Sequence, residues 1–186
     1  MKRLFDVALA LCALTVLWVP VVLVALAVRL TSTGPVLYWS DRVGRCNRIF
    51  KMPKFRSMRI DTPAVATHLL LDPEQWLTPI GSFLRRSSLD ELPQLWSIII
   101  GDMSFVGPRP ALFNQDDLII LRTECGVHRL PPGLTGWAQV NGRDELAIPE
   151  KVRLDVEYLQ AQSIYFDIKI LWMTALKVLA RDGVSH

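Results

Sequence analysis

Two adjacent carboxylates, Asp90 and Glu91, are the residues of this chain best placed to do chemistry. They follow a pair of arginines, Arg85 and Arg86, and precede an apolar run over 92–99 with helical spacing. A helix that starts here would point its free N–H groups and the positive end of its dipole at whatever lies beside Asp90. Such a place suits phosphate, so a carboxylate there is either a helix cap or a reagent.

Ordinary helix caps are the structural alternatives for the same residues. With Asp90 as N-cap, Pro93 falls at the third helical position, where its missing N–H costs nothing. In the rival arrangement Ser88 is the cap and Glu91 completes a capping box, which places Pro93 one turn inside the helix. Either helix should end at Gly101. Asp-Glu pairs are common, so spacing alone leaves cap and reagent open.

The first thirty residues predict a membrane segment. No charged residue occurs from Val7 to Val28, which is long enough to span a hydrocarbon core of about 30 Å. Pro20 removes one helical bond inside this run, and cationic residues, which favour the cytoplasmic side, flank both of its ends. An ordinary kinked transmembrane helix and a re-entrant helix broken at Pro20 are both open. We divide the chain into this segment, 1–30, and a cytoplasm-facing catalytic domain at the membrane interface, 31–186.

The domain is expected to be mainly α with a short β-hairpin, an α+β fold. Hairpin strands are expected at 36–40 and 49–55, and helices from Ile80 to Leu84 and over 114–122, 149–162 and 165–181. Residues 61–78 read as a linker, and 130–143 is too rich in Pro and Gly for a regular element. The apolar stripe of the last helix either packs on the core or makes an amphipathic helix in the membrane interface.

Basic residues are concentrated between Arg29 and Arg59, where eight Lys or Arg stand against one acid, Asp41. Such a surface could touch anionic lipid headgroups, bind phosphate, or both. Farther on, two prolines around Arg109 hold its backbone at low entropic cost, and a fixed guanidinium suits phosphate recognition. The net charge of +3 is a weak bias, and we expect no nucleic acid among the partners. Three scattered cysteines favour a reducing, cytoplasmic setting.

Short motifs from one end of the chain to the other are specific when taken together and in this order. They are TGPV at 33–36, RVGR at 42–45, KFRSM at 54–58, SLDELPQL at 88–95, GDMS at 101–104, GPRP at 107–110 and PGLTGWAQVNGR at 132–143. With them the chain, from Lys2 to His186, resembles the bacterial sugar transferases of the monotopic phosphoglycosyl transferase superfamily, close to their minimal catalytic form.

The resemblance implies a reaction. A sugar-1-phosphate moves from a UDP-sugar to a polyprenol phosphate such as undecaprenyl phosphate, UMP leaves, and assembly of a surface glycan begins. It also implies that Asp90 is the nucleophile, forming a covalent phosphosugar intermediate, and that Glu91 is an acid/base or metal-supporting neighbour. Mg²⁺ is the implied cofactor, with Asp90 and Glu91 as its ligands. Covalent catalysis would divide a transfer between a soluble donor and a lipid acceptor into two steps.

A carboxylate that attacks an anionic phosphate needs cations around it. Lys54 and Arg109 are favoured because they lie in the family's most recognisable motifs. Gln139 and Arg143 belong to the turn-rich loop, whose side chains suit a nucleotide, sugar or phosphate. Asp167 matches an acidic position of the family and has no assigned role. The full set of substrate- and phosphate-binding candidates is Lys54, Arg56, Arg86, Arg109, Arg143, Gln139 and Asp167.

The resemblance also favours a re-entrant segment in a single leaflet of the bacterial inner membrane, with the active site facing the cytoplasm. The family's usual Ser-Pro break is Val19-Pro20 here, which lacks a hydroxyl that could satisfy backbone freed at the bend. Asn47 replaces a frequent Gly, a mild change because Asn tolerates left-handed backbone. The expected partners are a UDP-sugar, polyprenol phosphate and the cytoplasmic leaflet. Whether the chain forms a homo-oligomer is left open.

Two rival functions come from other classes. A non-catalytic membrane protein would bind lipid headgroups through its basic face and use Asp90 and Glu91 only as caps. A phosphohydrolase would form an aspartyl-phosphate and pass it to water. Asp90→Asn distinguishes the transferase from the first rival. Asn caps a helix as well as Asp does, so a cap survives the change and a nucleophile does not. Product analysis with and without polyprenol phosphate separates the second.

Overall fold

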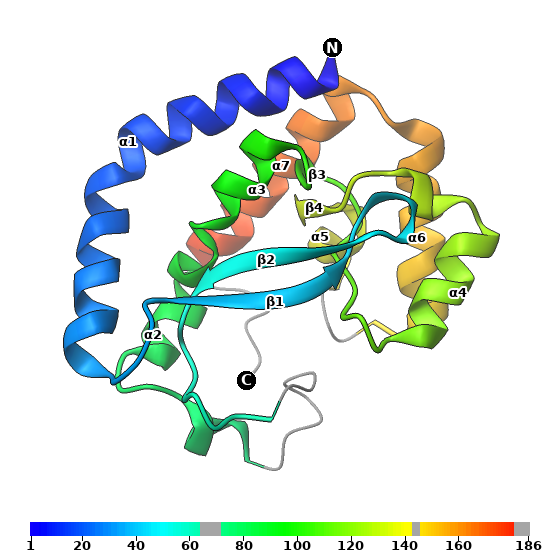
Figure 1. The fold of residues 1–186 in the computed structure, drawn as a ribbon. Helices are drawn as coiled ribbons and strands as arrows, with labels where there is room; N and C mark the ends of the chain where they lie inside the picture. The colour runs from blue at the N-terminus through cyan, green and yellow to red at the C-terminus, as the bar shows by residue number, and fades with distance from the viewer. Residues whose placement is uncertain (64–71, 143–145, 181–186) are drawn as a thin grey trace.

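A long N-terminal helix arches around a small domain built from short helices, a β-hairpin and a pair of short parallel strands (Figure 1). The computed structural model describes residues 1–63, 72–142 and 146–180. The hairpin lies at the centre of the view, α3 and α7 lie between it and the long helix, and α4 and α6 form the opposite end. The expected mainly helical fold with a short hairpin is confirmed.

The N-terminal helix α1 (Lys2–Thr31) is long and apolar enough to cross a membrane, as judged by length and composition. It continues through Pro20, so the expected break is instead a bend within one helix, which Figure 1 shows near its middle. Proline removes a single backbone bond, and the turns on either side keep the helix continuous. Much of α1 is exposed, including Trp18 and Leu23, whereas Ala10 and Val28 face the domain and are buried.

The predicted hairpin is confirmed. Strands β1 (Leu37–Val43) and β2 (Ile49–Phe55) pair antiparallel, with Tyr38 opposite Lys54. The connection contains a short 3₁₀ turn, η1 (Arg45–Asn47), in which Asn47 has φ +59°, the left-handed conformation that asparagine tolerates. Phe55, at the end of β2, packs with Val28 of α1 and thereby attaches the hairpin to the long helix.

The carboxylate pair lies between two short helices, α2 (Gly81–Arg86) and α3 (Gln94–Ile100). Neither predicted cap forms: Ser88 does occupy the N-cap position of η4, but its side chain makes no cap hydrogen bond. Asp90 and Glu91 belong to a separate 3₁₀ turn, η4 (Leu89–Glu91), and Pro93 occupies the N-cap position of α3. Proline fixes a φ that suits a helix start and needs no N–H partner, so α3 begins there without a side-chain cap. Gly101 ends α3 in left-handed backbone, as expected.

The turn-rich stretch 130–143 is more regular than predicted. It contains strand β4 (Gly133–Thr135), which pairs parallel with β3 (Ser104–Val106), and helix α5 (Trp137–Asn141). The glycines permit close strand contact: a Cβ on Gly133 would lie 2.1 Å from the Gly107 nitrogen. Glycine here serves backbone approach as well as turning.

The remaining described helices are α4 (Asp116–Glu124), α6 (Ile148–Ala161) and α7 (Ile164–Ala180), with 3₁₀ turns η3 (Pro73–Trp76) and η5 (Val127–Arg129). The expectation that the last helix packs on the core is confirmed for one of its faces. Its inner face packs on the domain, because Asp167 and Ile170 are buried, and its outer face exposes Ile168 and Trp172. A surface of this kind suits a membrane interface, and that placement is still a prediction.

Candidate active site

Asp90 and Glu91 face a cluster of cations contributed by separate elements. Asp90 is 6% exposed on η4, and Glu91 beside it is partly exposed. Lys54 Nζ, near the end of β2, lies 2.8 Å from Glu91 Oε1. Nη1 of Arg109 lies 4.0 Å from the same oxygen. Residues more than 50 positions apart in the chain thus form one charged site.

The electrostatic environment of Asp90 makes its carboxylate unusually basic. Burial raises the pKa of Asp90 to about 6, and the neighbouring Glu91 charge adds to this rise, while Lys54 and Arg85 oppose it. A carboxylate with a pKa near 6 is mostly ionised at pH 7, yet more basic than an exposed aspartate. A carboxylate in such a partly dehydrated site is suited to act as a nucleophile.

Arg85, and not its neighbour Arg86, faces the carboxylates. Burial lowers the pKa of Arg85, and the charges of Asp90 and Glu91 counteract that effect, whereas Arg86 is exposed. Arg86 was the predicted residue, and Arg85 was missed. Arg85 lies one turn after Gly81, which is buried on α2, so the two residues share the inward face of the helix.

The loop that carries Arg109 is held firmly by backbone bonds. Gly107 N–H donates to the Thr135 carbonyl and Gly133 N–H donates to the Pro108 carbonyl, both at 2.9 Å. Arg122 Nη1 of α4 donates to the Arg109 carbonyl at 2.7 Å. The expectation of a fixed Arg109 backbone thus gains a physical basis beyond its two flanking prolines.

Arg122 is itself fixed by a buried carboxylate. Its Nε and Nη2 donate to Asp155 Oδ2 of α6 at 2.9 and 2.7 Å. Burial raises the pKa of Asp155, and the Arg122 charge opposes the rise. Sequence reasoning missed both residues, because Arg122 and Asp155 lie on different helices outside the recognised motifs.

Two other candidates lie against the long helix instead. Arg56 is buried and donates to the Ser32 carbonyl at 3.0 Å, to Ser32 Oγ at 2.7 Å and to the Thr33 carbonyl, all just past the end of α1. Asp167 is buried on α7, where it accepts hydrogen bonds of 2.6 Å from both Lys2 Nζ and the Tyr158 hydroxyl. These contacts give Arg56 and Asp167 a role in holding α1.

The turn-rich loop contributes one describable candidate. Gln139 is buried on α5, and its amide nitrogen donates to the Leu134 carbonyl at 3.0 Å. Its Oε1 is buried without a hydrogen-bond partner among the described residues. Arg143 lies outside the residues that the structure describes.

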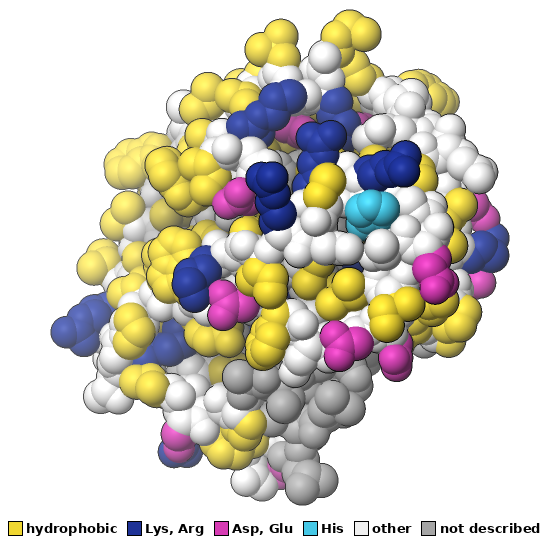
Figure 2. Space-filling model, turned by 45° about the vertical axis from the view of Figure 1, so that its right-hand side comes forward, with side chains coloured by type: hydrophobic (Ala, Val, Ile, Leu, Met, Phe, Trp, Pro, Cys, Tyr) yellow, Lys and Arg dark blue, Asp and Glu magenta, His cyan; other side chains and the backbone are white. Residues whose placement is uncertain are grey.

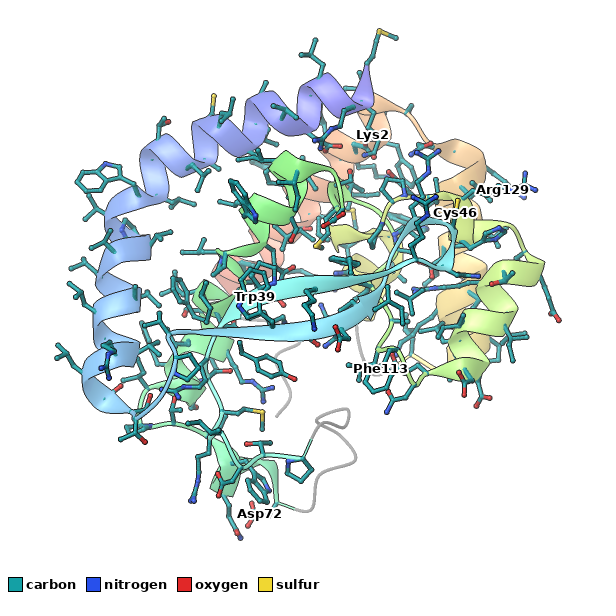
Figure 3. The ribbon with its side chains drawn as sticks, viewed as in Figure 1. Lys2, Trp39, Cys46, Asp72, Phe113 and Arg129 are labelled. Carbon is teal, nitrogen blue, oxygen red and sulfur yellow. The ribbon has the colours of Figure 1, made fainter. Side chains whose placement is uncertain are left out.

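The basic stretch does not form one continuous surface, because its members divide between the site, the interior and the exterior. Lysine and arginine side chains do gather on one face of the molecule (Figure 2). Arg45 and Arg48 are exposed at the hairpin turn, and Arg45 Nε donates to the carbonyl of Arg129 on η5 at 3.0 Å. Figure 3 shows Cys46 of this turn close to Arg129. The exposed arginines at the hairpin turn remain suited to binding anionic lipid headgroups.

The carboxylate pair fits Mg²⁺ that arrives with a phosphate substrate. Among the described residues there is no group of three His, Cys, Asp or Glu side chains that could hold a metal ion. Mg²⁺ is commonly bound through one or two carboxylates together with substrate phosphates and water. Asp90 and Glu91 are two adjacent carboxylates of this kind, and Lys54 and Arg109 place positive charge beside them.

Comparison with known proteins identifies the family of this chain. The family model described as bacterial sugar transferase matches residues 1–181. The chain belongs to this family. The predicted membership is therefore confirmed.

Similar curated proteins share this region. The chain is 40% identical over 188 residues to the UDP-glucose:undecaprenyl-phosphate glucose-1-phosphate transferase of Xanthomonas campestris pv. campestris, covering 97% of this chain and 39% of the relative. It is 39% identical to the uncharacterized sugar transferase EpsL of Bacillus subtilis (strain 168), covering 100% and 91%. It is 36% identical to the undecaprenyl-phosphate galactose phosphotransferase of Salmonella typhimurium, covering 98% and 41%. The chain thus spans about two fifths of the length of the glucose and galactose enzymes.

Proposed function

We propose that this protein is a polyprenyl-phosphate sugar-1-phosphate transferase that works through a covalent aspartyl intermediate. The observation that carries the proposal is Asp90: a buried carboxylate with a raised pKa, next to Glu91 and facing Lys54, Arg85 and Arg109. A helix cap would not need this concentration of positive charge. Two relatives named as undecaprenyl-phosphate glucose and galactose enzymes support the same reaction class.

In the first step an Asp90 carboxylate oxygen attacks the sugar-bearing phosphorus of a UDP-sugar. A phosphorus–oxygen bond forms to Asp90, and the bond between that phosphorus and the bridging oxygen breaks, so that UMP leaves with the bond's electron pair. Attacking and leaving oxygens lie roughly in line in such displacements. Lys54, Arg85 and Arg109 neutralise the anionic groups that meet there.

In the second step a phosphate oxygen of the polyprenol phosphate attacks the same phosphorus. The bond to Asp90 breaks, the carboxylate is restored, and the product is a polyprenyl diphosphate sugar. Mg²⁺, held by Asp90 and Glu91 with the phosphates, would supply further charge neutralisation. The Lys54–Glu91 ion pair orients Glu91 and keeps a cation beside the phosphate path.

We further propose that α1 is re-entrant and enters a single leaflet of the cytoplasmic membrane. Both of its ends bind the same domain: Arg3 Nη2 donates to the Ile99 carbonyl at 2.5 Å, and Arg56 holds Ser32 at the other end. A helix that crossed the bilayer would place its ends on opposite sides and could not make both contacts. The bend near the middle of α1 supports the same arrangement (Figure 1). The positive-inside tendency then assigns both ends to the cytoplasm.

The direct test uses protein purified into lipid nanodiscs with Mg²⁺, UDP-glucose or UDP-galactose, and undecaprenyl phosphate. The proposal predicts UMP and a lipid diphosphate sugar, both lost in Asp90→Asn and both kept in Asp117→Asn, a matched change on the exposed surface of α4. UMP with free sugar phosphate, formed equally without lipid acceptor, would identify a hydrolase. Absence of turnover over a broad donor panel would favour a non-catalytic lipid-binding protein.

A further inference from the structure

A single carboxylate of the membrane helix contacts the strand that leads to Arg109. Asp6 lies on the second turn of α1 and is 3% exposed. Its Oδ2 accepts a hydrogen bond from Ser104 Oγ at 2.9 Å, and its Oδ1 accepts one from the Phe105 backbone N–H at 3.2 Å. A carboxylate at the edge of an apolar helix is costly to keep unless it is needed.

Asp6 replaces a neighbouring strand on the free edge of β3. The other edge pairs with β4, where Ser104 N–H donates to the Pro132 carbonyl. Because alternate residues of a strand point their N–H groups to opposite edges, Phe105 N–H points away from β4 and toward α1. Asp6 satisfies this buried donor and fixes β3 laterally.

Displacement of β3 would be transmitted to the guanidinium of Arg109. Only Gly107 and Pro108 separate the strand from Arg109, and both are tied to the β4 segment by backbone bonds. We propose that Asp6 is a positioning residue for Arg109. The first two turns of α1, here called the N-terminal arm, are then part of the active-site scaffold. This inference rests on the proposed function, in which Arg109 contacts the reacting phosphates.

The charged residues close to Asp6 on α1 contact other parts of the domain. Lys2 binds Asp167 of α7, and Arg3 binds carbonyls at the end of α3 (Figure 3 labels Lys2). Those contacts dock the arm as a whole. Leu4, on the same arm, is 76% exposed and offers a control position that faces away from the domain.

Replacing Asp6 tests the arrangement without weakening membrane attachment. Asp6→Leu keeps an apolar helix and a similar side-chain volume but removes both acceptors. A small misplacement of a transition-state contact can lower a rate by about 10- to 100-fold, and we expect that loss in the single-turnover rate of UMP release. Asp6→Asn keeps one carbonyl oxygen for Phe105 N–H and should recover most of the rate. Leu4→Ala should leave the rate unchanged.

A double-mutant cycle with Arg109→Ala distinguishes positioning from a general structural effect. Rates are followed long enough to resolve the slow Arg109→Ala protein. If Asp6 acts through Arg109, Asp6→Leu slows the wild type strongly and the Arg109→Ala protein little. Equal fold losses in both backgrounds would overturn the inference, as would an unchanged rate in Asp6→Leu.

Ser104→Ala is the second variant, in case Asp6→Leu does not fold. It leaves Asp6 in place and removes one of its two donors, so a smaller loss that again depends on Arg109 is expected; a loss independent of Arg109 would refute the inference. Wild-type protein without UMP release would instead refute the proposed function. The two failures are therefore distinguishable.

Discussion

Replacing Asp90, the proposed nucleophile, should make this protein more stable at neutral pH. Asp90 is buried, and its pKa is raised from 3.8 to about 6, so ionising it in the folded state costs free energy. Each pKa unit corresponds to about 1.4 kcal/mol, which gives a total of about 3 kcal/mol. Because the pKa of Asp90 is higher in the folded than in the unfolded state, its proton stabilises the folded state. This stabilisation is fully present below the unfolded pKa and is lost as pH rises through 6. Asp90→Asn removes the titration.

The magnitude can be worked out for an accessible pH range. Between pH 4.5 and 7.5 the linkage relation with pKa values of 3.8 and about 6 gives a change of about 2 kcal/mol. For a domain of this size, that corresponds to about 4–8 °C in Tm. Relative to wild type, Asp90→Asn should therefore gain about this much in Tm over the range, because groups that do not interact with Asp90 titrate equally in both proteins.

The assay is thermal unfolding of both proteins in one detergent at matched pH values. Asp117→Asn on the exposed face of α4 is the control and should show a much smaller pH-dependent difference. A Tm difference between Asp90→Asn and wild type that does not change with pH would refute the argument from burial. A difference of opposite sign would mean that Lys54 and Arg85 outweigh the desolvation of Asp90.

Three further predictions concern the site, the support of α1 and its topology. Lys54→Met removes a charge that lowers the Asp90 pKa, so the acidic limb of the pH–rate profile for UMP release should move to higher pH; an unmoved limb would contradict this. Arg56→Met removes the buried donor to Ser32 and should cost about 2–3 kcal/mol, measured as a lower Tm, whereas an unchanged Tm would deny its structural role. Alkaline phosphatase fused to the N-terminus should be inactive in cells and green fluorescent protein there should fluoresce, whereas active phosphatase would indicate a spanning helix.

Local signals predicted the elements whose causes are local. The hairpin followed from two β-rich runs around a Gly/Asn turn, and α3 ended where Gly101 supplies left-handed backbone. The β3–β4 pair could not be found in this way. Its strands have three residues each, too few for a periodicity, and the residues that pair are 29 positions apart, as Ser104 and Gly133 are.

The site shows the same division. Asp90, Glu91, Lys54 and Arg109 lie in recognisable motifs, and the fold brings them together. Choosing between Arg85 and Arg86 required knowing which face of α2 is turned inward. That face depends on how Gly81 packs, and so Arg85 was missed.

Family motifs also mark positions that support the fold. Arg56 belongs to such a motif and Asp167 matches an acidic position of the family, yet both hold the ends of α1. Asp6 was overlooked because the uncharged run was counted from Val7. A carboxylate one residue outside an apolar helix was the available signal, since such a group needs a buried partner.

In the proposed mechanism Asp90 carries the sugar phosphate covalently. Intact-mass spectrometry of the protein with Mg²⁺ and a panel of UDP-sugars, without lipid acceptor, tests it most directly. We expect a mass increase equal to one sugar phosphate on the wild type, absent in Asp90→Asn and lost when polyprenol phosphate is added. UMP release that requires the lipid acceptor, with no adduct from any donor, would contradict the account and show direct transfer.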